Sequence, residues 1–137
     1  MAQDAWFPAQ EHFRCTGVTV VKVHGEVDLT TSDHMRDRIL RAARDSRCSC
    51  LVVDMSGIDF FGACGVGALV AVHRELTRQG RHMALAEPTP IAARVLDVLD
   101  MAQLFDVYPL VEMALTHTDG PRVDGVSVTA DPGSKVP

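Results

Sequence analysis

The most informative part of the sequence for chemistry is a glycine-rich stretch, residues 54–67, which leads from an apolar run into a helical pattern. Backbone N–H groups at a helix start have no partner within the helix, so such a turn can face an anion or donate hydrogen bonds to another molecule. Its glycines at positions 62, 65 and 67 match neither the dinucleotide-binding pattern nor the P-loop, and no lysine follows. The spacing therefore disfavours a phosphate cradle.

The other reactive side chains do not form a catalytic or metal-binding set. The four cysteines and six histidines lack the spacing of a zinc site. Glu26 and Asp28 could act as a carboxylate pair, but no nucleophile or ligand set accompanies them. His73 lies on the apolar side of a helical pattern, which is typical of a partly buried structural histidine. We therefore predict that the chain is not an enzyme and holds no cofactor or metal.

Cys64 is the thiol within the glycine-rich stretch. A thiolate is favoured at the start of a helix, so a redox-sensing role is chemically open to it. The alternative is that Cys64 is a small packing residue, and the sequence favours this interpretation.

The elements that must position this stretch alternate between strands and helices. Strands are predicted at 18–24, 51–55, 82–86 and 104–107, and 57–65 is predicted to be a turn. Helices are predicted to begin at Thr30 or Thr31, at Gly65, at Thr89-Pro90 and at Pro109. This alternation predicts an α/β domain, with a small mixed sheet packed against about four helices.

Composition narrows the possible partners and the extent of the domain. The 137 residues carry a net charge of −5, which argues against nucleic acid or an anionic membrane surface as a partner. The N-terminus does not resemble a signal peptide and no apolar run reaches the roughly 18 residues of a membrane helix, so we expect a cytoplasmic protein. Residues 116–137 contain no Leu, Ile or aromatic residue, which predicts a disordered tail.

Three motifs in register resemble a known family. Asp54-x-Ser56-x-Ile58-x-Phe60, a short turn and Gly65-Val66-Gly67-x-Leu69 resemble the STAS domain of bacterial anti-sigma factor antagonists. Upstream, Gly25-Glu26-Val27-Asp28 is similar to their Gly-Glu-hydrophobic-Asp segment, and residues 90–96 and 101–105 are similar to their third helix and final strand. The resemblance covers residues 13–115, which leaves residues 1–12 as an N-terminal extension.

The resemblance implies a non-enzymatic interaction module that affects sigma-factor-dependent transcription. Such proteins bind an anti-sigma factor of the ATPase-like serine kinase type, which inactivates them by phosphorylating a serine in the turn. The resemblance implies partner contacts at Asp28, Thr30, Phe61, Gly62, Ala63, Cys64, Gly65 and Val66. Asp28 is expected to shape its loop or to meet the partner. The chain itself is expected to be a monomer or a weak dimer.

The sequence departs from the family in the turn that is phosphorylated. Where the family reads Asp-Ser-Ser-Gly, this chain has Gly62, Ala63, Cys64 and Gly65. Ala63 occupies the phosphoacceptor position and has no hydroxyl, so we predict that phosphorylation at the usual site is lost. A small-ligand or thiol redox sensor on the same fold is the alternative function.

Overall fold

The sheet is built from strands that alternate with helices along the chain. The computed structural model describes residues 17–46, 49–117 and 122–129. The strands are β1 (Val18–Val27), β2 (Cys50–Phe61), β3 (His82–Ala86), β4 (Asp106–Tyr108) and β5 (Arg122–Thr129). They lie in the order β4-β3-β2-β1-β5, and each neighbouring pair is parallel. The predicted α/β class is confirmed, with a sheet that is parallel among the described strands instead of mixed.

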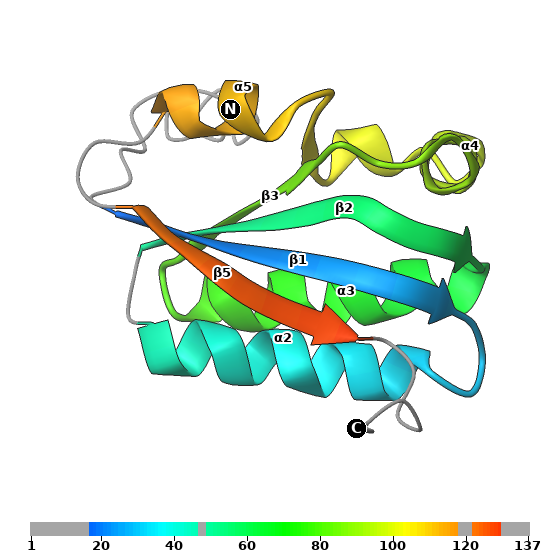
Figure 1. The fold of residues 1–137 in the computed structure, drawn as a ribbon, viewed down its shortest axis with the longest axis horizontal. Coiled ribbons are helices and arrows are strands. Elements are labelled where there is room, and N and C mark those ends of the chain that lie inside the picture. The colour runs from blue at the N-terminus through cyan, green and yellow to red at the C-terminus, as the bar shows by residue number, and fades with distance from the viewer. Residues whose placement is uncertain (1–16, 47–48, 118–121, 130–137) are drawn as a thin grey trace, which may run out of the picture.

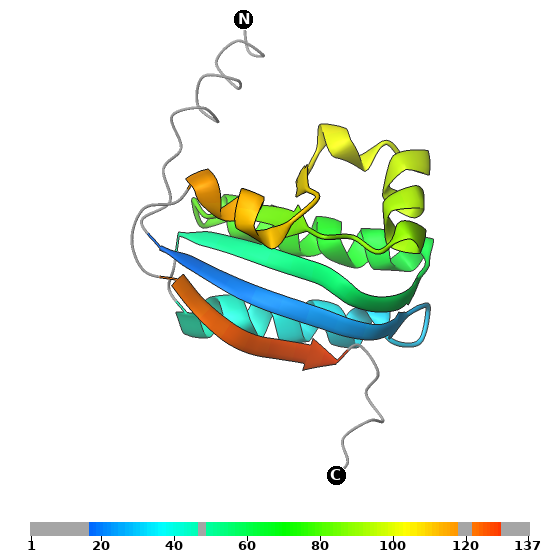
Figure 2. The same cartoon turned by 45° about the horizontal axis from the view of Figure 1, so that its top comes forward.

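Helices cover both faces of this sheet (Figures 1 and 2). The four α-helices of the described residues are α2 (Ser32–Ser46), α3 (Ala63–Arg78), α4 (Pro90–Val98) and α5 (Val111–Ala114). Helices α2 and α3 lie side by side on one face, and α5 lies on the other. Short 3-10 turns, η1 (Met101–Gln103) and η2 (Leu115–His117), follow α4 and α5. Parallel strands need such crossover connections, which explains the alternation in the sequence.

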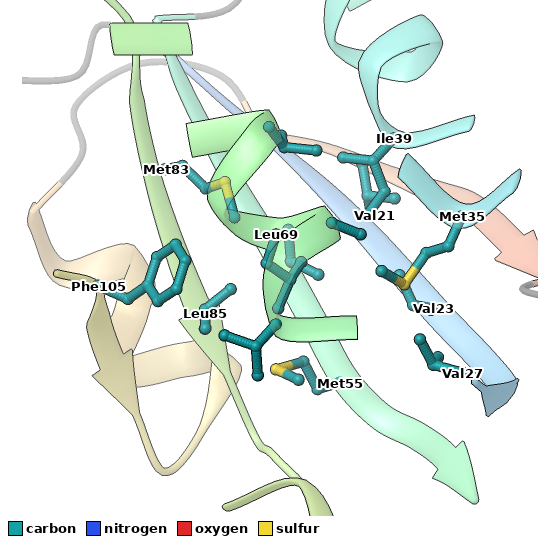
Figure 3. Packing of buried hydrophobic residues seen from close by; sticks show 14 of the residues in the cluster. Val21, Val23, Val27, Met35, Ile39, Met55, Leu69, Met83, Leu85 and Phe105 are labelled. Atoms are coloured by element: carbon teal, nitrogen blue, oxygen red, sulfur yellow. The ribbon is translucent and has the colours of Figure 1, made fainter. Parts of the chain in front are cut away.

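The main core lies between the sheet and the α2–α3 layer (Figure 3). Alternate side chains of the central strands enter it, because successive residues of a strand point to opposite faces. Its fully buried members include Val21, Val23, Met35, Ile39, Met55, Leu69 and Leu85. The residues between them, such as Val20 and Val52, pack on the other face with Val111 and Ala114 of α5. Burial on both faces explains the continuously apolar run at 51–53.

The structure corrects the prediction of a turn at 57–65. Strand β2 continues to Phe61 and pairs with β1 as far as its last residue, Val27. Gly57 lies inside β2 beside a register shift in β1, where an added Cβ would lie 2.7 Å from the Cβ of His24. Glycine at this position therefore permits two strands to approach closely and does not reverse the chain. The connection to α3 is reduced to Gly62.

The structure also corrects the prediction of a disordered tail. Residues 122–129 form strand β5, which pairs in parallel with β1 from Val18↔Arg122 to His24↔Thr129. Three valines in eight residues favour a strand, but the glycines and prolines around them dominated the composition of the segment. Residues 118–121 and 130–137, and the predicted extension at 1–12, lie outside the described residues.

Candidate functional site

The first part of the candidate site is the loop between β1 and α2. The Asp28 carboxylate accepts hydrogen bonds from the Thr30 backbone N–H at 2.9 Å and from the Thr30 hydroxyl at 2.8 Å. It also accepts a bond from the Thr31 backbone at 3.2 Å. These bonds, with the Thr30 hydroxyl first, lower the pKa of Asp28 because they favour its charged form. Asp28 thus shapes the loop, one of its two expected roles.

Thr31 closes this loop from the inside. Its hydroxyl donates to the Glu26 carbonyl at 2.7 Å and accepts from the Asp28 backbone N–H at 2.9 Å. The residue is only 7% exposed, so both bonds are largely shielded from water. The loop is therefore held in one conformation before any partner arrives.

The second part of the site is the start of α3. The Gly62 N–H donates to the Val27 carbonyl at 2.8 Å, which ties the end of β1 to the start of this helix. Ala63 is exposed, and Cys64 is a half-buried free thiol. The β1–α2 loop and the start of α3 thus lie at the same edge of the sheet, where β1 and β2 end (Figure 1). The structure brings together the two segments that the resemblance selected.

Three of the residues expected to contact a partner are buried. Phe61 is 1% exposed and Val66 is 4% exposed, and both belong to the main core. Gly65 is also buried, and an added Cβ there would lie 2.6 Å from the Phe61 ring and 2.8 Å from Val27 Cγ1. The side chains of Phe61 and Val66 close the core and are not available for the expected contact. Asp28, Thr30, Ala63 and Cys64 keep some exposure.

Two exposed apolar residues at this edge were missed by the sequence analysis. Leu29 is 83% exposed and Phe60 is 43% exposed. Phe60 pairs with Glu26 across the sheet, whereas Phe61 turns into the core. Ile58 and Phe61 both enter the core although they are three residues apart, because the register shift between Gly25↔Ile58 and Glu26↔Phe60 interrupts the alternation at Asp59. Simple alternation from Ile58 would place Phe60 in the core, so the sequence pattern does not distinguish the two phenylalanines.

The same edge is acidic. Residues 26–35 and 57–65 include four carboxylates, Glu26, Asp28, Asp33 and Asp59, and no lysine or arginine. Arg36, in the first turns of α2, lies 3.3 Å from Asp33 and partly neutralises it. Glu26 and Asp59 are exposed. The edge therefore presents negative charge to any partner.

A second polar cluster, also missed from the sequence, joins the first residues of three strands. The Cys50 thiol lies 3.5 Å from His82 Nδ1, and His82 Nε2 lies 3.0 Å from an Asp106 carboxylate oxygen. Cys50 is fully buried, so this row ties β2, β3 and β4 together and does not expose a nucleophile. Among the described residues, no three His, Cys, Asp or Glu side chains, these included, are arranged so that they could hold a metal ion.

His73 and a small cavity complete the survey of candidate sites. His73 packs edge-on against Phe105 with ring centroids 5.4 Å apart, and burial lowers its pKa, as expected for a structural histidine. A cavity of about 130 Å³ lies between α4 and β4 and is lined by Pro88, Ala93, Leu96, Asp97, Ala102 and Val107. None of these lining residues belongs to the stretch at 62–67, which the small-ligand alternative requires.

The fold and the site define an α/β domain whose candidate binding region is an exposed, acidic edge of a parallel sheet. The sequence profile of the STAS domain matches residues 11–114. The chain belongs to the STAS domain family. Strand β5 lies beyond the matched region, so the sheet of this chain extends past the profile.

Several of the similar proteins are named anti-sigma factor antagonists. The chain is 28% identical to an anti-sigma F factor antagonist of Paenibacillus polymyxa over 109 residues, which cover 80% of this chain and 92% of that protein. It is also similar to the crystal structure of an anti-sigma factor antagonist from Mycobacterium paratuberculosis, with a TM-score of 0.61 and 27% identity. This match covers 69% of this chain and 81% of that one. The unphosphorylated form of the antagonist SpoIIAA shares the fold, with a TM-score of 0.57, 21% identity and coverage of 71% and 85%.

These relatives are regulatory proteins, and the STAS identity expected from the sequence is confirmed. Over the described part of the chain, the helices fall short of the length and apolar character that a membrane span requires.

Proposed function

We propose that this chain is an anti-sigma factor antagonist that binds an ATPase-like serine kinase and is not switched by phosphorylation at the start of α3. The function is that of a binding module, not an enzyme. Its relatives' names and the exposed edge formed by the 28–31 loop and the start of α3 support the antagonist role. The partner is a cytoplasmic regulator, so the chain is expected in the cytoplasm.

The observation that carries the loss of phosphoregulation is the exposed alanine at position 63. In the family pattern a serine at this place accepts the phosphate, and an exposed methyl group has no oxygen to do so. Gly62 also replaces the preceding aspartate of the pattern. A chain with these residues remains in the binding-competent state whenever it is expressed, so its activity is set by its abundance.

The first test is calorimetric titration against each ATPase-type anti-sigma factor of the source organism, purified separately. Wild-type protein is expected to bind one of them. Ala63→Glu would place a fixed charge where the contact is proposed and is expected to weaken binding by about 2–5 kcal/mol if that charge is buried unpaired. The folded chain should lose little stability, since a helix start tolerates an anion. Equal affinities for the two proteins would remove the start of α3 from the interface.

The second test restores the missing switch. Wild-type protein incubated with the same kinase and ATP is expected to gain no phosphate at the start of α3, detected by mass spectrometry. An added Cβ at Gly62 would lie 3.5 Å or more from its neighbours, so the Cβ of an aspartate fits there without displacing them. The double variant Gly62→Asp, Ala63→Ser is therefore expected to be phosphorylated and then to release the kinase. Phosphorylation of the wild-type chain on another hydroxyl near this site, such as Ser56 or Thr30, with release of the kinase would contradict the proposal.

The same titration distinguishes the thiol redox-sensor alternative from the proposed function. If Cys64 is a packing residue, Cys64→Ser should bind with wild-type affinity, with or without peroxide treatment. A peroxide-dependent change of affinity in the wild type that the variant lacks would favour the redox sensor.

A further inference from the structure

Leu29 is the most exposed large apolar side chain among the described residues, at 83%. It lies in the loop that leaves β1, and Phe60, at 43%, lies near the end of β2 at the same edge of the sheet (Figure 1). The carboxylates of Glu26, Asp28 and Asp59 belong to these same two segments. We call these five residues the carboxyl-end surface. It combines one protruding leucine with a partly exposed ring and three acids.

The loop that carries Leu29 is rigid enough to present it. The Asp28 carboxylate holds the two residues that follow Leu29, and the buried Thr31 hydroxyl bonds the backbone of Glu26 and Asp28, which precede it. Such a loop loses little conformational entropy when it binds, which favours affinity. Exposure of the Leu29 side chain to water is unfavourable in the free protein. Burial of this side chain in an apolar pocket of a partner would remove that cost.

We propose that Leu29 inserts into an apolar pocket bordered by lysine or arginine residues on the anti-sigma partner. This inference rests on the proposed function and specifies the chemistry of that partner's surface. The leucine supplies the apolar anchor, and the carboxylates of the carboxyl-end surface pair with the basic border. Anchors of this kind carry most of the energy of an interface, while charges at its rim orient the partners and speed their encounter.

The negative charge of the carboxyl-end surface favours a protein partner with a basic border over other binding partners. A second copy of the chain would bring the same acids face to face in a symmetric contact, where like charges repel. Nucleic acid and anionic lipid would meet the same repulsion. A protein surface with an apolar centre and basic rim satisfies both features at once.

The anchor is tested with Leu29→Ser in titrations against the anti-sigma factor that binds the wild type. Its matched control is Val98→Ser, which removes an apolar side chain of similar exposure, 71%, from the end of α4. Leu29→Ser is expected to weaken binding at least tenfold, and Val98→Ser less than twofold. Thermal melts of both variants should match that of the wild type, since neither side chain is buried.

The charges are tested with the double variant Glu26→Gln, Asp59→Asn in titrations over a range of sodium chloride concentrations. Wild-type affinity is expected to fall as salt rises, because salt screens the attraction to the basic border. The double variant should bind severalfold more weakly at low salt and show a flatter salt dependence.

The outcomes separate this inference from the proposed function. If Leu29→Ser binds as well as wild type while Ala63→Glu does not, the inference is overturned and the function stands. A Leu29-dependent dimer in sedimentation experiments, or an affinity that rises with salt, would also overturn it. If no anti-sigma factor binds the wild type, the proposed function fails and the inference fails with it.

Discussion

Thr31 shows how much of the candidate site depends on one side chain. Its hydroxyl donates to the Glu26 carbonyl and accepts from the Asp28 N–H, two backbone groups that flank Val27, the last residue of β1. Asp28 in turn holds Thr30. The loop is therefore held by the shielded hydrogen bonds of Thr31 and by the exposed hydrogen bonds of Asp28. We expect the shielded bonds to contribute more to its shape, because water does not readily replace them.

Replacement of Thr31 by valine, which has nearly the same shape, is expected to destabilise the protein by about 1–3 kcal/mol, because two shielded backbone groups lose their partner. Urea denaturation measures the change. Thr31→Ser keeps the hydroxyl and should cost clearly less than Thr31→Val. A Thr31→Val variant as stable as the wild type, with the loss of stability in Thr31→Ser instead, would show that packing of the Thr31 methyl group and not hydrogen bonding holds the loop.

At the scale of elements, the close approach of β1, β2 and α3 decides the position of the site. Gly65 lets α3 begin directly over the Phe61 ring and the Val27 side chain. This contact and the Gly62–Val27 hydrogen bond hold the one-residue connection between β2 and α3 against the end of β1. The exposed Ala63 is fixed at the edge as a consequence.

Two glycines of α3 offer a matched test of this contact. An added Cβ at Gly65 would overlap Phe61 and Val27, so Gly65→Ala is expected to cost about 1–3 kcal/mol in overpacking. At Gly67 a Cβ meets nothing within 4 Å, so Gly67→Ala should stabilise the helix by about 0.5–1 kcal/mol. Chemical denaturation of both variants gives the comparison. A Gly65→Ala variant as stable as Gly67→Ala would show that α3 can move away from the sheet freely.

At the scale of the whole molecule, β5 changes the boundary of the domain. It covers the side of β1 that would otherwise be an open strand edge, and β1 carries the loop of the candidate site. The family match ends at residue 114, before this strand. We therefore propose that the folded unit of this chain extends to residue 129.

A chain that ends at His117 is expected to be less stable than the full protein by about 2–4 kcal/mol, since each lost ladder hydrogen bond contributes about 0.5–1.5 kcal/mol. Its exposed β1 edge should also favour aggregation, visible in light scattering. A chain that ends at Ala130 keeps β5 and is the control. Equal unfolding midpoints for the two truncated chains would show that β5 adds nothing to stability.

Local patterns in the sequence were sufficient for much of this architecture. The apolar run at 51–53, the strand at 82–86 and the helical spacing through Leu69 and Leu76 are local signals of buried strands and an amphipathic helix, and the structure has these elements. The three motifs in register identified the family. Periodicity is informative here because each element buries one side or both, so its apolar residues recur with the period of a helix or a strand.

Tertiary structure alone decided which side chains of the site are exposed and where the sheet ends. Phe60 and Phe61 are identical in type, and only the pairing of β2 with β1 turns Phe61 inward and leaves Phe60 at the surface. The valines of β5 form a strand because β1 offers its open edge, a contact between residues about a hundred positions apart. Such long-range backbone pairing leaves almost no signal in the local sequence, since the partner strand and not the segment's own composition supplies the hydrogen bonds.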